Sequence, residues 1–285
     1  MPAVESCSAH ALLRLARREL DAAGVEEPLL AARVLLAHAL GMDRAELLRR
    51  GDLRVAPEAA DRFLELVAEK ARRVPLAYLV GIREFYGRSF EVTPAVLVPR
   101  PETELLVELA IEFAVSGGVA LDVGTGSGCI AVSVAAEGWG RVVGIDCSGE
   151  ALQVARRNAL RHGVAERVQF LRGDLLGAVA NRSADLALAN LPYIPTAELE
   201  TLAPEVRDHE PRAALDGGAD GLDPYRRLLH QGRRVLRRGG RLAVEVGAGQ
   251  AGAVRDLLAA LGYGATETRR DLAGIERVVT GVWRG

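Results

Sequence analysis

Roughly the first 75 residues carry apolar side chains at helical spacing. After Ser8, a candidate cap, apolar residues recur every three or four positions as far as residue 20, which predicts an amphipathic helix that stops near Gly24. The same spacing predicts three more helices, over 28–40, 43–50 and 57–73. Four short helices joined by short loops predict a helical bundle.

A period of two replaces the helical spacing after residue 80. Phe85, Tyr86, Phe90 and Val92 lie around Gly87, which predicts a β-hairpin that links two domains. The prolines that follow at 94, 99 and 101 predict an extended, stiff stretch.

Short apolar runs alternate with helical patterns from residue 102 onward. The runs of buried-strand type cover Val119–Val123, 142–145, 168–171, 186–189 and 242–246. Helical patterns cover Cys129–Ala136, 150–161, 224–236 and 251–261, and two closing strands are expected at 265–269 and 277–283. This alternation predicts an α/β fold with a doubly wound, mainly parallel sheet of the Rossmann-like type. We therefore divide the chain into a helical domain (1–80), a hairpin linker (81–98) and an α/β domain (99–285).

Composition narrows the class of protein. With 49% hydrophobic and 26% charged residues the chain suits a soluble, packed globule, and no apolar window is long enough to span a membrane. Residues 1–13, interrupted by Glu5 and His10, do not resemble a signal peptide, and the three cysteines fit neither a metal site nor a disulfide framework. The net charge of −2 argues against broad binding to nucleic acid. We expect a cytoplasmic protein with no bound metal and no membrane contact.

A glycine-rich turn follows the first of the buried strands. The run Gly124-Thr125-Gly126-Ser127-Gly128 leads directly into the helix that starts at Cys129. Glycines allow a tight turn and a close approach of the backbone to a ligand, and the helix behind them offers free amide donors. This feature alone leaves two interpretations open. The turn either binds a ligand or only allows the helix to pack on the sheet. Cys129 stands where a dinucleotide fingerprint would have its third glycine.

Acidic residues follow at the ends of the first three strands. Asp146 comes 18 residues after Gly128, where a carboxylate suits the two hydroxyls of a ribose; the alternative is a helix cap. Asp122, Asp146 and Asp174, the last followed by Leu175, are all expected to point into the crevice at the strand ends. Together with the glycine loop these residues resemble the S-adenosylmethionine site of class I methyltransferases.

The fourth strand ends at Asn190-Leu191-Pro192-Tyr193. The Asn190 side-chain oxygen and the Leu191 carbonyl are suited to accept the two hydrogens of a planar NH2 group, and Tyr193 to stack on that group. Accepting both hydrogens would aim the nitrogen at a methyl donor, so that position and electrostatics perform the displacement. The alternative is a proline-rich turn.

This signature resembles the Asn-Pro-Pro-Tyr motif of amino-group methyltransferases, from which it departs at Leu191. Enzymes that dimethylate adenine in ribosomal RNA commonly show Asn-Leu-Pro-Tyr, so the motif alone does not choose between protein and RNA as substrate. Leucine keeps the carbonyl, and Pro192 still favours an extended residue 191.

Longer segments of the sequence favour a protein substrate over RNA. Residues 73–87, 96–104, 205–222 and 271–277, which include Pro-Arg-Pro-Glu-Thr-Glu at 99–104, resemble the release factor glutamine methyltransferase family (PrmC/HemK) over nearly the whole chain. The resemblance implies transfer of a methyl group from S-adenosylmethionine to the glutamine of the Gly-Gly-Gln motif in bacterial class I peptide chain release factors. It implies that the helical leader helps to hold that partner, and RNA dimethylases are not expected to carry the segment at 99–104.

The resemblance also assigns the site. The residues implied to hold the cofactor are Gly124, Thr125, Gly126, Ser127, Gly128, Asp146, Asp174, Leu175 and Asn190. Those implied to hold the glutamine are Asn190, Leu191, Pro192 and Tyr193, with Asn190, Pro192 and Tyr193 as the catalytic group. Relatives often have tryptophan at the position of Leu175, and Arg100 and Glu102 are expected to brace the acceptor entrance.

Three other functions stay open at this point. An adenine-amino methyltransferase would need a basic groove, whereas the arginine doublets (17–18, 49–50, 72–73 and 237–238) are more typical of solvated helix faces. A nicotinamide dehydrogenase would have no function for residues 190–193. A catalytically silent binding module would retain partner binding without turnover. Cys129 is interpreted as a small buried apolar residue rather than a nucleophile.

Overall fold

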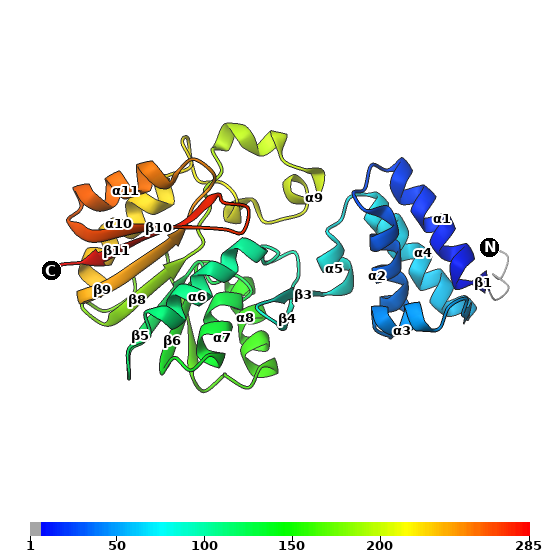
Figure 1. The fold of residues 1–285 in the computed structure, drawn as a ribbon, viewed down its shortest axis with the longest axis horizontal. Coiled ribbons are helices and arrows are strands. Elements are labelled where there is room, and N and C mark those ends of the chain that lie inside the picture. The colour runs from blue at the N-terminus through cyan, green and yellow to red at the C-terminus, as the bar shows by residue number, and fades with distance from the viewer. Residues whose placement is uncertain (1–6) are drawn as a thin grey trace. The chain divides into compact units, whose positions relative to one another are not determined.

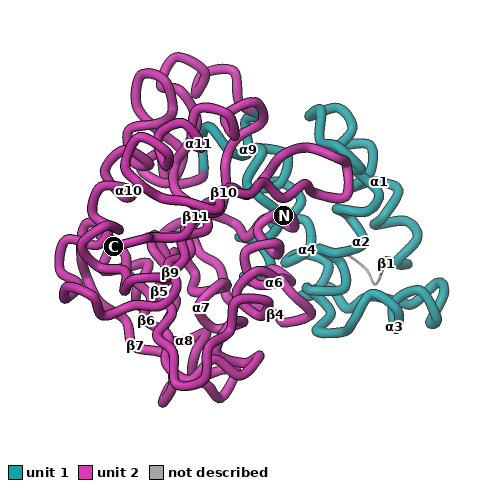
Figure 2. The backbone as a smooth tube through the Cα atoms, turned by 60° about the vertical axis from the view of Figure 1, so that its left-hand side comes forward, with its two compact units in different colours: residues 1–81, 203–209 teal, residues 82–202, 210–285 magenta. Residues whose placement is uncertain are grey.

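A computed structural model describes residues 7–285 of the chain. The chain forms two compact units, coloured separately in Figure 2. The first comprises residues 1–81 together with 203–209, and the second comprises 82–202 and 210–285. Each unit has its own buried apolar core. Within residues 7–285, no helix combines the length and the apolar character that crossing a bilayer requires.

Helices make up most of the first unit, and the four predicted from the sequence are confirmed: α1 (Ala9–Ala22), α2 (Pro28–Leu40), α3 (Arg44–Arg49) and α4 (Pro57–Ala71). The Ser8 hydroxyl caps α1 by accepting the Ala11 N–H at 3.3 Å, and α2 ends at Gly41 in the left-handed conformation. Periodicity missed a short helix, α5 (Leu76–Val80), and a pair of two-residue strands, β1 (Cys7–Ser8) and β2 (Arg54–Val55). Elements this short contain too few residues to show a period.

Glu205 anchors the segment 203–209, which contains helix α9 (Pro204–Arg207), within the first unit. Its carboxylate accepts hydrogen bonds from Arg73 at 2.6 and 2.7 Å and from Lys70 at 3.3 Å. Lys70 is the single lysine of the chain and is only 5% exposed. The expectation that the 72–73 doublet is a solvated helix face is therefore wrong for Arg73, whose guanidinium is held by a carboxylate 132 residues away.

The Glu205→Gln substitution is expected to destabilise the first unit by about 1–3 kcal/mol, because it leaves the buried Lys70 ammonium without its carboxylate. Burial alone would raise the pKa of Glu205, but the Arg73 hydrogen bonds and the Lys70 charge lower it to about 2. A carboxyl whose folded-state pKa is lowered stabilises the fold above its usual pKa of 4.5, and that contribution is lost as the pH falls through about 2. Urea unfolding of the wild type and Glu205→Gln at pH 7 and pH 3 tests this.

The difference in unfolding free energy between the wild type and Glu205→Gln should be smaller at pH 3 than at pH 7. Glu198→Gln, a substitution at an exposed position in the 3₁₀ helix η2 (Thr196–Thr201), serves as the control and should leave the unfolding curve in place. Equal stability of Glu205→Gln and wild type at pH 7 would rule out an anchoring role for Glu205.

The predicted hairpin is confirmed as β3 (Ile82–Phe85) paired with β4 (Arg88–Glu91). Tyr86 and Gly87 both have positive φ, as the two central residues of a tight hairpin turn require. Phe85 and Phe90 are buried in the core of the second unit and meet edge to face, with ring centroids 6.0 Å apart.

A seven-stranded sheet forms the centre of the second unit (Figure 1). Its strands lie in the order β10-β11-β9-β8-β5-β6-β7, and all are parallel except β11. Their bounds are β5 Val119–Val123, β6 Arg141–Asp146, β7 Val168–Arg172, β8 Ala184–Ala189, β9 Leu236–Glu245, β10 Tyr263–Arg270 and β11 Glu276–Trp283. The predicted doubly wound, mainly parallel sheet is confirmed.

Helices cover both faces of this sheet. One face carries α6 (Glu104–Glu112), α7 (Cys129–Ala136) and α8 (Gly149–Arg161), and the other carries α10 (Asp223–Val235) and α11 (Ala251–Ala260) (Figure 1). The largest boundary error is at β9, which begins at Leu236, where a helix was expected, and not at 242; the other strand bounds differ by at most two residues. Leu236 pairs with Ala184, and a register shift accommodates the exposed arginines between that pair and Arg241. The alternation of side chains that marks a strand is absent there, because both faces are polar.

The strand order places the site. The chain runs outward from β5 through β6 to β7 and then returns to β8 on the other side of β5. Ligands of open α/β sheets bind at such a reversal, beyond the carboxyl ends of the strands.

Candidate active site

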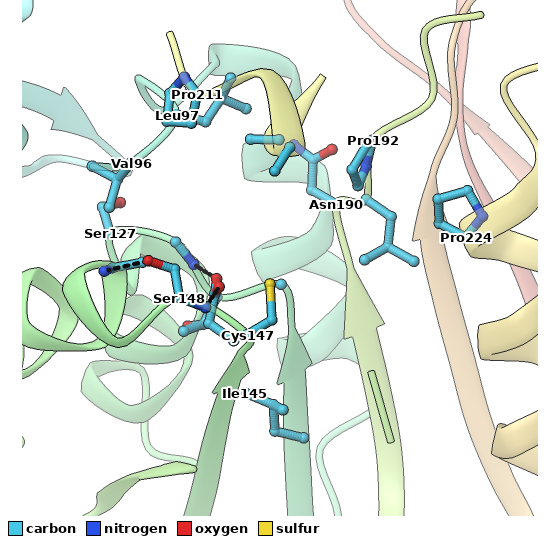
Figure 3. A pocket seen from close by; sticks show the side chains of 18 of the residues that line it. Val96, Leu97, Ser127, Ile145, Cys147, Ser148, Asn190, Pro192, Pro211 and Pro224 are labelled. Carbon is cyan, nitrogen blue, oxygen red and sulfur yellow. Dashed lines mark hydrogen bonds between the residues drawn. The ribbon is translucent and has the colours of Figure 1, made fainter. Parts of the chain in front are cut away.

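A pocket of about 360 Å³ opens where the strand order reverses. In the sheet, Val123 of β5 lies beside Ile145 of β6 and Ala189 of β8, so the residues that follow these strands meet at one edge. Figure 3 shows Asn190 and Pro192 on one side of the pocket and Ser127 and Ser148 on the other. The size falls within the range of small-molecule sites.

The glycine loop requires glycine at two positions, because φ is positive at each and a Cβ there would come too close to a neighbouring residue. Gly124 has a φ of +76°, and a Cβ there would stand 3.1 Å from a methyl of Leu191. Gly128 has a φ of +79° at the start of α7, and a Cβ there would stand 3.0 Å from the Cβ of Ala155. The loop can therefore follow the pocket wall only without side chains at these positions.

Asp122 supports the loop from beneath, and the expectation that it points into the crevice is wrong. Its carboxylate is fully buried and accepts the Thr125 hydroxyl at 2.6 Å and the Ala131 N–H at 3.0 Å. Burial raises the pKa of Asp122 to about 6. Successive residues of a strand point to opposite faces, and the sequence alone did not show that Asp122 faces the underside of the loop.

Asp146 ties two backbone segments together at the pocket. Its carboxylate accepts the Gly126 N–H and the Ser148 N–H, both at 2.9 Å. The cap of α8 is Ser148, whose hydroxyl accepts the Ala151 N–H, so the alternative of Asp146 as the helix cap is excluded. Its position at the end of β6 fits the role of holding a polyhydroxylated ligand.

The third strand supplies a charged and an apolar group to the same wall. Asp174 forms an ion pair with Arg227 of α10, and both line the pocket. Leu175 also lines it and adopts a left-handed conformation with a φ of +50°, which is uncommon for leucine. Backbone strain of this kind concentrates at ligand sites.

The residues after β8 divide between pocket and core. The Asn190 Nδ2 donates to the hydroxyl of Thr103 at 2.9 Å, and Asn190, Leu191 and Pro192 all line the pocket. The Leu191 side chain is 4% exposed and packs in the core of the sheet, which accommodates the departure from proline at this position. Tyr193 does not line the pocket: its ring lies near Gly247 and its carbonyl accepts the Gln250 side chain at 2.8 Å.

Two glutamates lie behind this wall. Glu210 is 2% exposed in its side chain and accepts a hydrogen bond from Arg100 at 2.7 Å, which holds Arg100 at the pocket. That Arg100 braces the acceptor entrance stays a prediction. Glu245 ends β9 and is also buried; burial raises its pKa to about 7, although a hydrogen bond from Thr103 lowers it in part. Glu102 does not line the pocket.

Comparison with known proteins places the chain in a family. Residues 11–81 match the family described as the PrmC N-terminal domain, and residues 120–209 match the family described as a methyltransferase domain. A release factor glutamine methyltransferase of Geobacter sulfurreducens is 46% identical over 259 residues, 90% of each chain. One of Nitratidesulfovibrio vulgaris is 44% identical over 273 residues, 94% of this chain and 92% of the relative. The chain belongs to the release factor glutamine methyltransferase family.

Solved structures agree with this family on the fold. A methyltransferase from Pyrococcus furiosus superposes with a TM-score of 0.53 at 19% identity, over 69% of this chain and 89% of that one. At this identity the likeness shows the class I methyltransferase fold of the second unit and nothing about its substrate.

Most of the residues that the family resemblance assigned lie at the pocket. Those that line it are Gly124, Thr125, Gly126, Ser127, Asp146, Asp174, Leu175, Asn190, Leu191 and Pro192. Gly128 and Tyr193 do not, and the roles of all these residues remain predictions. The sequence missed Thr103 and Arg227 as pocket residues. The position of Thr103 inside Pro-Arg-Pro-Glu-Thr-Glu was the one available signal.

Asp146→Asn is expected to weaken cofactor binding about 10- to 100-fold, the effect of losing one or two hydrogen bonds to a charged group. The Gly126 and Ser148 N–H groups donate to different oxygens of Asp146. In asparagine one of these oxygens is replaced by NH2, which cannot accept, so one of the two hydrogen bonds is lost. Titration calorimetry with S-adenosylmethionine measures the change. The exposed Asp256→Asn on α11 is the control, and an unchanged dissociation constant for Asp146→Asn would contradict the assignment.

Proposed function

We propose that this protein binds S-adenosylmethionine in the pocket and methylates the side-chain amide nitrogen of the Gly-Gly-Gln glutamine in class I release factors. One observation supports this most strongly. Asn190 and Pro192 form the pocket wall opposite the glycine loop, so an amide at Asn190 faces whatever the loop holds (Figure 3). Family membership supplies the substrate class.

The groups that line the pocket fit this cofactor. The glycine loop brings backbone close to the ligand, Asp146 offers carboxylate oxygen to a ribose, and Leu175 offers an apolar face to an adenine ring. Leucine gives less stacking area than an aromatic residue would. When bound, the cofactor supplies a methyl group on a positively charged sulfur.

The part of the pocket that holds the glutamine amide needs only groups that accept hydrogen bonds. An amide nitrogen is a poor nucleophile, because its lone pair is delocalised into the carbonyl. The Asn190 Oδ1 and the Leu191 carbonyl accept its two hydrogens, which raises electron density on nitrogen and orients it for an in-line displacement. The bond between the methyl carbon and sulfur would break as the bond to nitrogen forms, which leaves S-adenosylhomocysteine as the product. The nitrogen proton becomes acidic only as nitrogen acquires charge and would then pass to water, so neither a strong general base nor a metal is required.

The first unit is proposed to hold the release factor, as its match to the PrmC N-terminal domain suggests. A substrate of this kind is found in the cytoplasm, and we propose that location for the enzyme.

The reaction is tested by mass spectrometry of a release factor incubated with the full chain and S-adenosylmethionine. One added methyl group on the glutamine of the Gly-Gly-Gln peptide is expected. Incubation without cofactor, and a release factor carrying asparagine in place of that glutamine, are the controls. An unmodified peptide in the presence of bound cofactor, or methyl transfer to adenine in RNA instead, would overturn the proposal.

A further inference from the structure

Two buried polar side chains stand directly behind Asn190. Thr103 ends the 3₁₀ helix η1 (Pro101–Thr103), and Glu245 ends β9; each is 2% exposed. The Thr103 hydroxyl accepts the Asn190 Nδ2–H at 2.9 Å. The same hydroxyl also interacts with the Glu245 carboxyl, whose pKa it lowers. Three segments distant in sequence thus form one polar series that ends at the pocket.

The direction of these hydrogen bonds fixes the orientation of the Asn190 amide. A threonine hydroxyl carries one hydrogen, and a carboxylate can only accept. When Glu245 is ionised it takes that hydrogen, so Thr103 can offer Asn190 only a lone pair. The amide must then turn its NH2 toward Thr103, which leaves Oδ1 to face the pocket. An asparagine without such a partner could equally present its NH2 to the substrate.

We propose that Thr103 and Glu245 are positioning residues, which hold the Asn190 amide with its oxygen toward the methyl acceptor. This inference rests on the proposed function only for the identity of that acceptor. It assigns a task to the threonine of the Pro-Arg-Pro-Glu-Thr-Glu segment and to a buried carboxyl, one oxygen of which has no hydrogen-bond partner in the described part of the chain. Buried polar groups of this kind are costly unless their network is satisfied or used.

The series reverses when Glu245 is protonated, because a neutral carboxyl can donate to Thr103, and Thr103 can then donate to the Asn190 oxygen. Turnover is therefore expected to fall as the pH drops below about 7, the value to which burial raises the pKa of Glu245. The ionisable groups that interact with this carboxyl come from five parts of the second unit: Arg100 and Glu102 before α6, Cys129 of α7, Tyr193 after β8, Tyr225 of α10 and Arg277 of β11.

The first test compares Thr103→Val with Thr103→Ser. Valine keeps the shape and removes the hydroxyl, and is expected to lower kcat about 10- to 100-fold, as small misplacements of reacting groups do, with little change in KM for the release factor. Serine keeps the hydroxyl and should restore most of the turnover. Thr280→Val, which removes another buried hydroxyl on β11, is the matched control.

The kinetic outcomes are distinct. Turnover of Thr103→Val equal to wild type would overturn the proposal, and so would a loss that serine fails to restore or that Thr280→Val shares. The decline below about pH 7 should be present in wild type and absent in Glu245→Gln, which cannot ionise. Persistence of the same decline in Glu245→Gln would show that Glu245 does not set the orientation.

A second measurement does not depend on the substrate. In a spectrum of ¹⁵N-labelled full chain, the Asn190 side-chain NH2 signals are assigned by their disappearance in Asn190→Asp. The hydrogen bond to Thr103 should shift one of the two protons downfield in wild type and Thr103→Ser, and this shift should be lost in Thr103→Val. An unchanged shift in Thr103→Val would overturn the positioning role, whereas failure of wild type to methylate the release factor would count only against the proposed function.

Discussion

Asn190→Ala is expected to reduce turnover about 100-fold or more, the scale of losing one preorganised group at a reacting centre. The side chain lies on the pocket wall opposite the glycine loop. Its amide oxygen is proposed to orient the acceptor nitrogen, and the loop is proposed to hold the body of the cofactor. Because alanine removes the amide oxygen that orients the acceptor nitrogen, kcat should fall while the dissociation constant for S-adenosylmethionine stays close to the wild-type value. Single-turnover methylation of the release factor and calorimetry measure the two quantities separately.

Two variants make this result specific. Asn190→Asp keeps the shape but removes the NH2 donor to Thr103 and adds a charge, so it should be impaired as well. Asn181→Ala, at an asparagine that binds Arg234 outside the pocket, should methylate as wild type does. An equal loss of turnover and cofactor affinity in Asn190→Ala would mean that Asn190 mainly binds the cofactor.

The elements with strong local signals were predictable from sequence. Helix α2 starts at Pro28 and ends at Gly41, and both residues act locally, through a fixed φ and a left-handed conformation. Strand β5 and helix α7 were predicted to the residue, because an apolar run ends there at three closely spaced glycines. The position of the pocket wall was also predictable, since parallel strands bring their carboxyl ends to one edge of the sheet.

Contacts between distant segments were not predictable in this way. Thr103 and Asn190 are 87 residues apart, and no periodicity marks them as neighbours. The same holds for Arg73 and Glu205, which a sequence view treats as two exposed charges. Asp122 shows a further limit: its position near a strand end was clear, but burial beneath the loop depends on the path of the glycines after it.

Gly221→Ala is expected to reduce methyl transfer about 100-fold, as misplacement of acceptor-binding groups does, while cofactor binding persists. Gly221 has a φ of +75°, and a Cβ there would overlap the carbonyl oxygen of Tyr193 and stand 2.6 Å from the Gln250 Nε2. That Nε2 donates to the same carbonyl, so the methyl group would separate the two partners. The segment that carries Asn190 to Tyr193 would have to shift.

This effect differs from general backbone strain, and the chain offers a control that separates the two. Gly249 has a φ of +83°, and a Cβ there would meet no described atom within 4 Å, so Gly249→Ala introduces the strained conformation without the overlap. Both variants should lose some thermal stability, but only Gly221→Ala should lose methyl transfer at saturating S-adenosylmethionine. If the two variants were equally active, the acceptor segment would tolerate displacement, and Asn190 would have to act without the fixed position that its hydrogen bond to Thr103 implies.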